Sequence, residues 1–364
     1  MSRTVRLVTP IAKTARVKQV EGMFDVPTAA RSTVEIAIPD ELEAVARGST
    51  TQDWNVGLIV GPSGSGKSSV ARDLWPEYSG DGFDWPADRA IVDGFDAGIR
   101  ETVQLLTSVG FGSPPSWLRP YRALSTGEQF RADLARALAG PDDPIVYDEF
   151  TSAVDRRVAQ IGSHAVQKAV RRRKQRFVAV TCHHDVVEWL QPDWVFRPDS
   201  TDFEWRRLQP HPRLEFDVFP VHHSAWATFR HHHYLSATLH RAARCFVAEH
   251  DGQPVAFASY LHFAHPHAKR LKMFHRIVVL PDYQGIGLGG RLTEHVAQQL
   301  AGDGWSAHIT TGHPAFVAFM RRSPRWRELT RGRNAPARSA TSLFRAKHTD
   351  PRRLATRSFA YVPH

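Results

Sequence analysis

Short apolar runs recur through the first half of the chain and alternate with helical patterns. A strand that is covered on both faces carries no regular polar alternation, so these runs predict buried strands. Strands that alternate with helices predict an α/β domain. The strands are expected at 56–60, 89–95, 144–149 and 177–181, and the helices at 68–74, 99–109 and 130–138.

The first 55 or so residues show a different pattern, in which polar and apolar positions alternate in short runs. The alternation at 15–20 (ARVKQV) and at 33–38 (TVEIAI) is typical of strands with one exposed face. Edge strands of an antiparallel sheet are therefore predicted ahead of the first buried strand.

The second half of the chain begins after a polar, proline-containing stretch at 198–212. Such stretches mark exposed connections, so we predict one domain over 1–210 and another over 211–364. The clearest element of the second domain is a hairpin around Asp251-Gly252, a dipeptide that suits a tight turn. An α+β domain is expected, with strands at 214–219, 244–249, 254–260, 274–281 and 306–310, a helix at 291–300, and a histidine-rich helical stretch ahead of the hairpin.

The composition is that of a globular protein of 364 residues, a length that suits two domains. No segment approaches the roughly 20 continuous apolar residues that span a bilayer, and the first residues lack the apolar core of a signal peptide. A cytoplasmic protein that needs no membrane subunit is therefore expected. The two cysteines, Cys182 and Cys245, lie in apolar surroundings and are expected to stay reduced.

The formal net charge is +10, from 47 Lys and Arg against 37 Asp and Glu. A basic surface gains affinity for polyanions by releasing counterions, so nucleic acid is one candidate partner. The cations at 171–176 (RRRKQR) instead suit the end of a helix, where the helix dipole favours them. From 321 to 357 twelve Arg or Lys stand against two acids, with Trp326 and Phe344 interleaved. This basic C-terminal extension suits nucleic acid, and a solvated extension would look the same.

The chemistry of the first half centres on residues 61–68 (GPSGSGKS), directly after the apolar run at 56–60. Glycines let such a loop turn tightly and aim its N–H groups at nucleotide phosphates, while Lys67 reaches the terminal phosphates and Ser68 can ligate Mg²⁺. The strand before it and the helix after it are the context of a phosphate-binding P-loop. Phe24 and Trp54 precede this loop and could stack on adenine, although core packing is the favoured role for both.

Paired carboxylates end the apolar strand predicted at 144–149. Asp148 would hold Mg²⁺, directly or through water, and Glu149 would orient or deprotonate an attacking water. An apolar strand that ends in Asp-Glu is a weak signal alone, but it becomes specific at this distance after a P-loop.

Five motifs in this order resemble those of the ABC-type ATPases. The P-loop matches the family's Walker A, residues 124–128 (LSTGE) resemble its signature, and residues 145–149 (IVYDE) resemble Walker B with its catalytic glutamate. Residues 151–155 (TSAVD) resemble the D-loop, and the strand at 177–181 leads to histidines that resemble the switch histidine. The resemblance covers roughly residues 15–208.

The resemblance implies that two ATP molecules are held between two ATPase domains, in an ATP-dependent homodimer. Ser125 and Gly127 of one subunit would then cap the γ-phosphate that Lys67 of the other subunit holds. His183, at the end of its strand, is preferred to His184 as the switch histidine. The implied nucleotide-binding residues are Gly61, Ser63, Gly64, Gly66, Lys67, Ser68, Ser69, Ser125, Gly127 and Asp155, with Ser68 and Asp148 on Mg²⁺ and with Glu149, His183 and His184 as catalytic residues.

The chain departs from this family in the region ahead of the signature. Only about 55 residues separate the P-loop from the signature, which leaves a reduced helical subdomain, and no convincing glutamine stands at the usual Q-loop position. In transporters this region touches the membrane subunits. Because the chain has no apparent membrane segment, transport is not the expected function.

A second glycine-rich turn follows the strand predicted at 274–281. A strand that feeds such a turn and then a helix is a general pyrophosphate cradle, so by spacing alone a dinucleotide site also fits. Residues 284–289 (QGIGLG), however, resemble the acyl-CoA motif of the GNAT acetyltransferases, and the preceding hairpin and the strand at 306–310 follow that fold's order. This resemblance covers roughly residues 214–330. It implies that acetyl-CoA, or another acyl-CoA, is bound by Ile277, Val279, Gln284, Gly285, Ile286, Gly287 and Gly289.

GNAT chemistry needs a base for the acceptor amine and an acid for the leaving thiolate, and the sequence singles out no residue for either role. The histidines at 222–223 and 231–233 could bind a metal, but solvated or helix-packed histidines are the favoured interpretation. The acid and base candidates are His275, Glu249, Tyr260 and Tyr283. The region also resembles a GNAT-like domain that modifies adenine in phage DNA, and this resemblance makes Tyr234 and Tyr361 further candidate site residues.

An ABC-type ATPase fused to a GNAT-like domain is itself a recognisable arrangement. It implies an enzyme that binds and hydrolyses ATP and that is coupled in one chain to an acyl-CoA-dependent N-acyltransferase. Three alternatives remain open: an acyltransferase for nucleic acid, an acyltransferase for a protein or small amine, and a non-catalytic GNAT-like module in an ATP-gated DNA-binding clamp. Gating of transfer by ATP-driven dimerisation is a further hypothesis.

Overall fold

A computed structural model describes residues 3–26, 31–78, 82–206, 214–233, 237–264, 270–329 and 356–363. The chain forms two compact units, and each unit is built from two separate stretches of sequence. The first unit contains residues 1–84 and 136–212, and the second contains residues 85–135 and 213–364. The predicted boundary between residues 210 and 211 lies outside the described part of the chain.

The first unit is built on a five-stranded sheet with the order β4-β5-β3-β6-β7. Strands β3 and β5 are buried at every position, as their unbroken apolar runs predicted. Neighbouring strands are parallel except for the last pair, β6 and β7. The strands are β3 (Val56–Val60), β4 (Ile145–Tyr147), β5 (Phe177–Thr181), β6 (Trp194–Arg197) and β7 (Asp202–Trp205).

One helix of the first unit comes just before β3 in the chain, and others follow β3, β4 and β5. Helix α7 is buried along most of its length, and its last turn carries Arg171, Arg172 and Arg173, so the basic run is indeed the end of a helix. Arg171 is not simply solvated there, because its guanidinium lies 3.0 Å from a carboxylate oxygen of Asp193. The helices are α2 (Asp40–Ala46), α3 (Lys67–Leu74), α7 (Arg156–Arg173) and α8 (Val186–Leu190).

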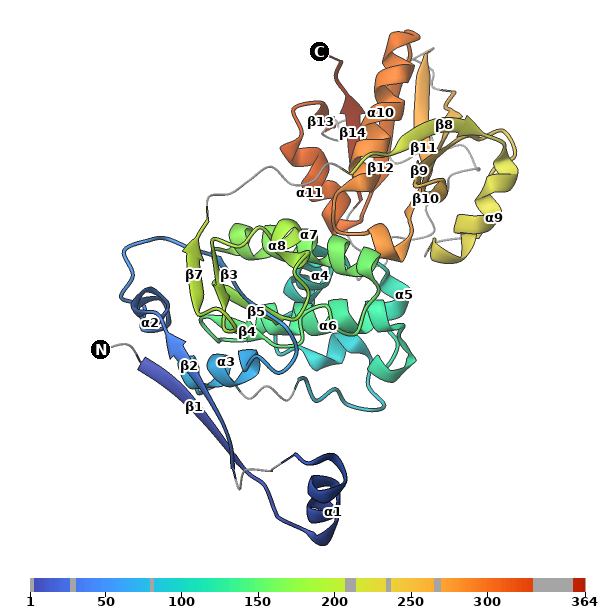
Figure 1. Cartoon of the computed structure of the whole chain (residues 1–364). Helices are drawn as coiled ribbons and strands as arrows, with labels where there is room; N and C mark the ends of the chain where they lie inside the picture. The colour runs from blue at the N-terminus through green and yellow to red at the C-terminus, as the bar shows by residue number, and fades with distance from the viewer. Residues whose placement is uncertain are drawn as a thin grey trace. The chain divides into compact units, whose positions relative to one another are not determined.

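The N-terminal residues form an antiparallel ribbon of β1 (Arg3–Pro10) and β2 (Arg31–Ile38), and Figure 1 shows helix α1 (Ala15–Phe24) at its far end. The strand predicted at 33–38 is confirmed, but the one predicted at 15–20 is wrong. The same residues also suit a helix, because Val17 and Val20 are three positions apart and Thr14 caps the first turn through the Val17 N–H at 3.3 Å.

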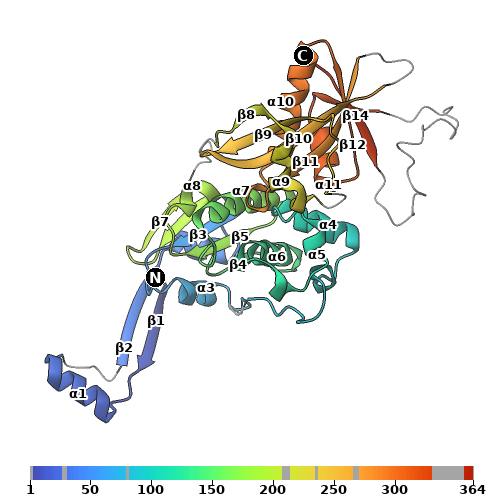
Figure 2. The ribbon, with the colours of Figure 1, turned by 90° about the vertical axis from the view of Figure 1, so that its right-hand side faces the viewer.

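The second unit contains a seven-stranded sheet with the order β13-β14-β12-β11-β10-β9-β8 (Figure 2). Only β11 and β12 pair in parallel, and helix α10 (Leu288–Gly302) packs against this part of the sheet. The hairpin turns through Asp251 and Gly252, both with positive φ, as predicted. The strands are β8 (Asp217–Val221), β9 (Arg244–His250), β10 (Gln253–His262), β11 (Leu271–Val279), β12 (Ser306–Thr311), β13 (Trp326–Glu328) and β14 (Arg357–Tyr361).

The stretch 85–135 of this unit is helical and leads to the signature-like residues. The strand predicted at 89–95 is wrong: residues Ile91–Gly94 form a 3-10 helix, because only three apolar residues stand ahead of an Asp-Gly pair. The helices are η1 (Ile91–Gly94), α4 (Ile99–Ser108), α5 (Pro114–Trp117), η2 (Tyr121–Ala123) and α6 (Thr126–Ala139), and α6 continues beyond this stretch. Among the described residues, no helix has the length and apolar character that a bilayer crossing requires.

Candidate active site

The P-loop connects the carboxyl end of β3 to helix α3. Gly64 and Gly66 have φ of 82° and 83°, a left-handed conformation that favours glycine, and Gly66 is the N-cap of α3. The Lys67 ammonium donates to the Pro62 carbonyl at 2.8 Å, so the side chain folds back over the loop. The first turn of α3 thus supplies backbone donors, a cation and the Ser68 hydroxyl at one place, which is a donor set that suits a nucleotide phosphate and Mg²⁺.

The paired carboxylates follow β4, two strands from the P-loop strand in the sheet. The Asp148 carboxylate accepts from the Glu149 N–H at 2.8 Å, and Glu149 has a φ of 51°. The Glu149 carboxylate accepts from the Ser152 hydroxyl at 2.5 Å. The exposed Glu149 side chain is therefore oriented by the residues that follow it, a support that motif reading alone did not identify.

The two histidines follow β5, the strand between β4 and β3. His183 is half-buried, and its Nδ1 lies 3.2 Å from the hydroxyl of the buried Thr151. His184 is exposed. Because parallel strands present their carboxyl ends at one edge of a sheet, the P-loop, the carboxylates and His183 all lie along that edge.

Asp155 has a structural role in addition to its predicted place in the nucleotide site. Its carboxylate accepts from the N–H groups of Arg157 and Val158 at 2.9 and 3.0 Å and so caps helix α7. The neighbouring Arg156 pairs with Asp185 through its Nε at 3.0 Å. This ion pair ties the D-loop-like segment to the residue after His184, and the motifs gave no indication of it.

The signature-like residues form a capping box at the start of α6. The Glu128 carboxylate accepts from the Ser125 N–H at 3.0 Å, and the Ser125 hydroxyl accepts from the Glu128 N–H at 3.3 Å. The other Glu128 oxygen accepts from the Ser116 hydroxyl at 2.7 Å. Ser125 is exposed and Gly127 is partly exposed at the helix N-terminus, where backbone donors are available to an anion.

The second glycine-rich loop lies between β11 and α10 and repeats the design of the P-loop. Gly285 and Gly287 have φ of 93° and 90°, and Gly287 is the N-cap of α10. Gly290 lies against α11 (Pro314–Arg322), where a Cβ would stand 2.6 Å from the Phe319 ring. The glycines thus permit both the turn and the close helix packing, and they leave the first N–H groups of α10 available for a pyrophosphate.

The predicted acyl-CoA residues flank this loop. Ile277 and Val279 pair with Ala258 and Ala256 of β10. The Gln284 carboxamide is engaged within the protein: its Nε2 donates to the Val279 carbonyl at 2.9 Å, and its Oε1 accepts from the Gly112 N–H at 2.8 Å.

The structure distinguishes His275 among the acid and base candidates. In the β10–β11 register Ser259 faces Arg276 and Tyr260 faces Phe274, so His275 is the extra residue of a β-bulge. Burial, together with Arg276, His240 and His233, lowers the pKa of this half-buried imidazole to about 4. His275 is therefore neutral at pH 7.

The other candidates have different surroundings. Burial raises the pKa of Tyr260. Tyr283 is buried against His250 and Phe216, and Tyr361 packs on Trp326 with ring centroids 5.4 Å apart. Glu249 lies opposite Asp217 and Pro254 in the sheet, and Tyr234 lies outside the described residues.

The clustered histidines lie on short helices ahead of the hairpin, η3 (His223–Ala225), α9 (Trp226–Phe229) and η4 (Arg230–His232). Within the described ranges no three His, Cys, Asp or Glu side chains converge as a metal site would require. Burial, then the neighbouring His231, lowers the pKa of His232, while Asp282 and Glu128 oppose this shift.

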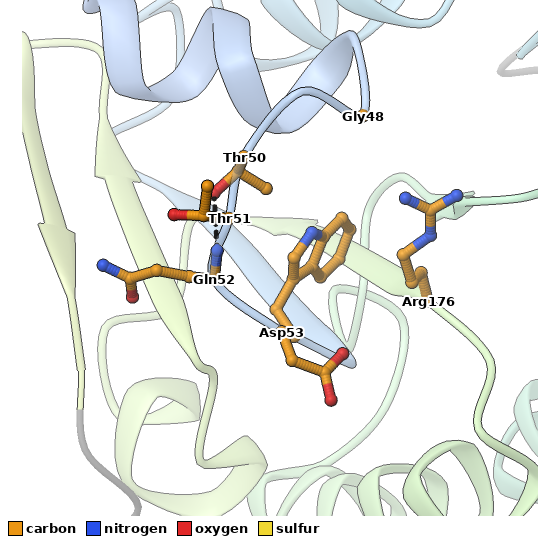
Figure 3. Close-up of a pocket in the computed structure, with 7 residues that line it drawn as sticks. Gly48, Thr50, Thr51, Gln52, Asp53 and Arg176 are labelled. Atoms are coloured by element: carbon orange, nitrogen blue, oxygen red, sulfur yellow. Dashed lines mark hydrogen bonds between the residues drawn. The ribbon is translucent and has the colours of Figure 1, made fainter.

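Trp54 lies at the other end of β3 from the P-loop. It lines a shallow pocket of about 320 Å³ with Gly48, Arg176 and residues 50–53 (Figure 3). Trp54 is 4% exposed, and its ring packs edge-on against Trp194 with ring centroids 5.5 Å apart. Five strand residues, roughly 16 Å, separate it from the phosphate loop, so core packing is its role. Phe24, in contrast, is 68% exposed at the end of α1, so the core role predicted for it is wrong.

Comparisons with known proteins give separate matches for the two halves. A family model of the acetyltransferase (GNAT) domain matches residues 241–322. The dimeric structure of MJ0796, a bacterial ABC transporter cassette, is 15% identical and covers 48% of this chain and 93% of that chain, with a TM-score of 0.36. The ribosomal-protein-S18-alanine N-acetyltransferase from Escherichia coli is 19% identical and covers 41% of this chain and 96% of that chain, with a TM-score of 0.30.

A Bacillus subtilis acetyltransferase in complex with CoA is 11% identical and covers 42% of this chain and 99% of that chain, with a TM-score of 0.28. No curated protein matches the chain. The GNAT acetyltransferase model thus matches residues 241–322, within the predicted second domain, and the solved structures similar to parts of this mixed α/β chain include ABC ATPase cassettes and GNAT acetyltransferases.

Proposed function

We propose that the protein hydrolyses ATP with its first half and transfers an acyl group from acyl-CoA to an amine with its second. The observation that supports both activities is a repeated device: a strand leads into a loop whose last glycine is a left-handed N-cap, Gly66 for α3 and Gly287 for α10. Each device aims the first N–H groups of a helix at a phosphate, as nucleotides and CoA both require.

In the ATPase reaction each residue at the sheet edge has a separate task. Lys67 and the P-loop amides hold the phosphates, and Ser68 and Asp148 would hold Mg²⁺, which when bound would supply positive charge to neutralise the phosphates. Glu149, oriented by Ser152, accepts a proton from the attacking water. His183, supported by Thr151, donates to the γ-phosphate, and its contact favours it over His184.

The nucleotide site is completed by a second copy of the chain. Ser125 and the N–H groups at Gly127 cap the γ-phosphate held by the other subunit, in an ATP-dependent homodimer. The capping box that holds Ser125 at the start of α6 supports this role, because it fixes the helix N-terminus while leaving Ser125 exposed.

In the acyltransferase reaction the acceptor nitrogen attacks the thioester carbonyl carbon. The new C–N bond forms as the C–S bond breaks, the amine proton passes to a base, and the CoA thiolate takes up a proton. His275 is the base that the geometry favours, because it stands in the bulge of the strand that leads to the acyl-CoA loop and is neutral.

The class of acceptor is inferred from charge alone. Nucleic acid is the first choice because the chain has a formal net charge of +10. Some of the cations are already paired: Arg321 binds Glu328 at 2.8 and 3.1 Å, and Arg325 binds Gln298 at 3.2 Å. Replacing the exposed Arg322 should therefore reduce the salt dependence of DNA binding more than replacing Arg321. If neither replacement changed the salt dependence of DNA binding, a protein or small-amine acceptor would be favoured.

Two binding measurements on the full chain test the proposed function. Lys67→Ala should abolish ATP binding and leave acetyl-CoA binding intact, whereas Gly287→Glu should do the reverse, so each variant is the control for the other. If Lys67→Ala still bound ATP and Gly287→Glu still bound acetyl-CoA, the assignment would be contradicted. Gating by ATP predicts that Glu149→Gln, which should trap an ATP-bound dimer, changes the rate of transfer. An unchanged rate in a trapped dimer would overturn the gating.

A further inference from the structure

The acyl-CoA loop touches a chain segment that belongs, by sequence, to the ATPase half. The Gly112 N–H donates to Gln284 Oε1 at 2.8 Å, and the Gly112 carbonyl lies 3.3 Å from Nε2 of His313, just ahead of α11. Burial lowers the pKa of His313, so its neutral imidazole donates to that carbonyl. Both backbone groups of Gly112 are thus bonded to the acetyltransferase domain.

The backbone at Gly110 lies even closer to the acyl-CoA loop. A Cβ on Gly110 would stand 2.6 Å from the Gln284 carbonyl oxygen and 3.4 Å from the Gly285 Cα, and Gly110 itself has a φ of 86°. Two backbones therefore lie in contact here, at the first glycine of the acyl-CoA loop. Only glycine permits this combination of conformation and distance.

Gln284 connects this contact to the sheet. One end of its carboxamide binds Gly112, and the other donates to the carbonyl of Val279, the last residue of β11. A side chain that is bonded within the protein at both polar ends can fix the position of the loop. The usual motif reading, in which Gln284 binds acyl-CoA directly, does not account for these bonds.

The segment that carries Gly112 is itself held by hydrogen bonds. The Phe111 N–H donates to the Leu106 carbonyl at 2.9 Å, and the indole N–H of the buried Trp117 donates to the Phe111 carbonyl at 2.9 Å. A loop fixed at both ends can impose a position on a neighbour, which a mobile loop cannot do.

We propose that residues 110–112 are part of the acyl-CoA site and position its loop through Gln284. Gln284 and Gly112 are positioning residues, which act on acyl-CoA through the amides of residues 285–287. The inference rests on the proposed acyl-CoA binding, and it adds that the acetyltransferase domain needs the segment ahead of the signature in order to bind its cofactor substrate well.

A double-mutant cycle on the full chain tests this role by titrating acetyl-CoA calorimetrically. Gly112→Ala places a Cβ 2.9 Å from Gln284 Oε1 and should displace that side chain, and Gln284→Ala removes it. Each change should weaken acetyl-CoA binding by roughly tenfold, and the double variant should be no weaker than Gln284→Ala. In a transfer assay, the KM for acetyl-CoA should rise while kcat changes little.

The matched control is Gly98→Ala in the same segment, where a Cβ would meet nothing within 4 Å. It should bind acetyl-CoA as the wild type does, and thermal unfolding should show all these variants to be folded. Equal affinities for Gly112→Ala and Gly98→Ala, or additive losses in the cycle, would overturn the positioning role. A wild-type protein that binds no acetyl-CoA would instead overturn the proposed function, and the inference with it.

Discussion

The Thr151 hydroxyl lies 3.2 Å from Nδ1 of His183, and this contact separates two histidines that the sequence leaves equivalent. An imidazole whose Nδ1 is hydrogen-bonded directs its Nε2 to a fixed position. His184 is exposed and does not have this contact with Thr151. His183→Ala should therefore lower the ATPase rate by roughly 10²-fold, the usual cost of losing one donor to a reacting centre. His184→Ala is the control and should retain most of the activity. The reverse order in a steady-state phosphate-release assay would contradict the assignment.

Ser116 lies on the hydrogen-bonded path between the signature and the acyl-CoA loop. Its hydroxyl donates to one carboxylate oxygen of Glu128, and the other oxygen accepts from the Ser125 N–H. The adjacent Trp117 donates to the Phe111 carbonyl, next to the Gly112 N–H that binds Gln284. If a nucleotide at Ser125 affects acyl-CoA binding, a non-hydrolysable ATP analogue should change the acetyl-CoA dissociation constant of the wild type several-fold. Ser116→Ala should reduce this change and leave acetyl-CoA binding without nucleotide nearly unaltered.

Nucleotide dependence that persists in full after Ser116→Ala would mean that the coupling takes another route. Ser108→Ala is a matched control, because its hydroxyl donates to the Leu105 carbonyl within its own helix. It should keep the wild-type dependence on nucleotide.

Gly290 should prove essential for stability. A Cβ at this position would stand 2.6 to 2.7 Å from the Phe319 ring, so alanine would force α10 away from α11. Overpacking of this kind costs about 1–3 kcal/mol of unfolding free energy. Gly302→Ala, at the last residue of the same helix, meets nothing within 4 Å and should be neutral or slightly stabilising. Chemical denaturation compares the two, and equal stabilities would contradict the packing described.

The pH dependence of transfer should identify the base. An imidazole with an ordinary pKa would lose activity below about pH 6.5, whereas His275, with a pKa lowered to about 4, stays neutral and should hold kcat/KM constant down to about pH 5. His275→Gln should abolish this transfer. An acid limb near pH 6.5 in the wild type would point to another base.

The same lowered pKa affects stability. The folded state binds the proton less tightly than the unfolded chain, so the contribution of His275 to folding is complete above about pH 6.5 and is lost as the pH falls toward 4. His275→Gln should therefore show a smaller loss of stability over that interval than the wild type does.

The elements that carry the proposed ATP site could be predicted because the P-loop, the carboxylates and the histidines each come after an apolar strand. Neighbouring parallel strands then bring Lys67, Asp148 and His183 to one edge, an outcome that follows from the strand order. The contacts that distinguish His183 and orient Glu149 come from the turn at 150–155, whose path depends on left-handed residues that the motif does not specify.

The acyl-CoA loop shows the limit of the sequence more clearly. Its glycines are recognisable because turns and helix starts are local, but the partner of Gln284 is Gly112, 172 residues away. A pattern of apolar and polar residues reports local structure, so it cannot predict a contact between residues so far apart in the sequence. Local patterns also misled twice, at 15–20 and 89–95, where short mixed runs suit a helix or a 3-10 turn as well as a strand.

The measurement that tests the central claim most directly is the transfer of a labelled acetyl group from acetyl-CoA into the DNA, RNA, protein and small-molecule fractions of a cell extract. It should be made with and without ATP, and Gly287→Glu should serve as the inactive control. The account predicts that the wild type labels one fraction, with nucleic acid the first expectation, that ATP changes the amount of label, and that Gly287→Glu does not label. No label in any fraction from a protein that still hydrolyses ATP would contradict the acyltransferase assignment and favour a non-catalytic DNA clamp.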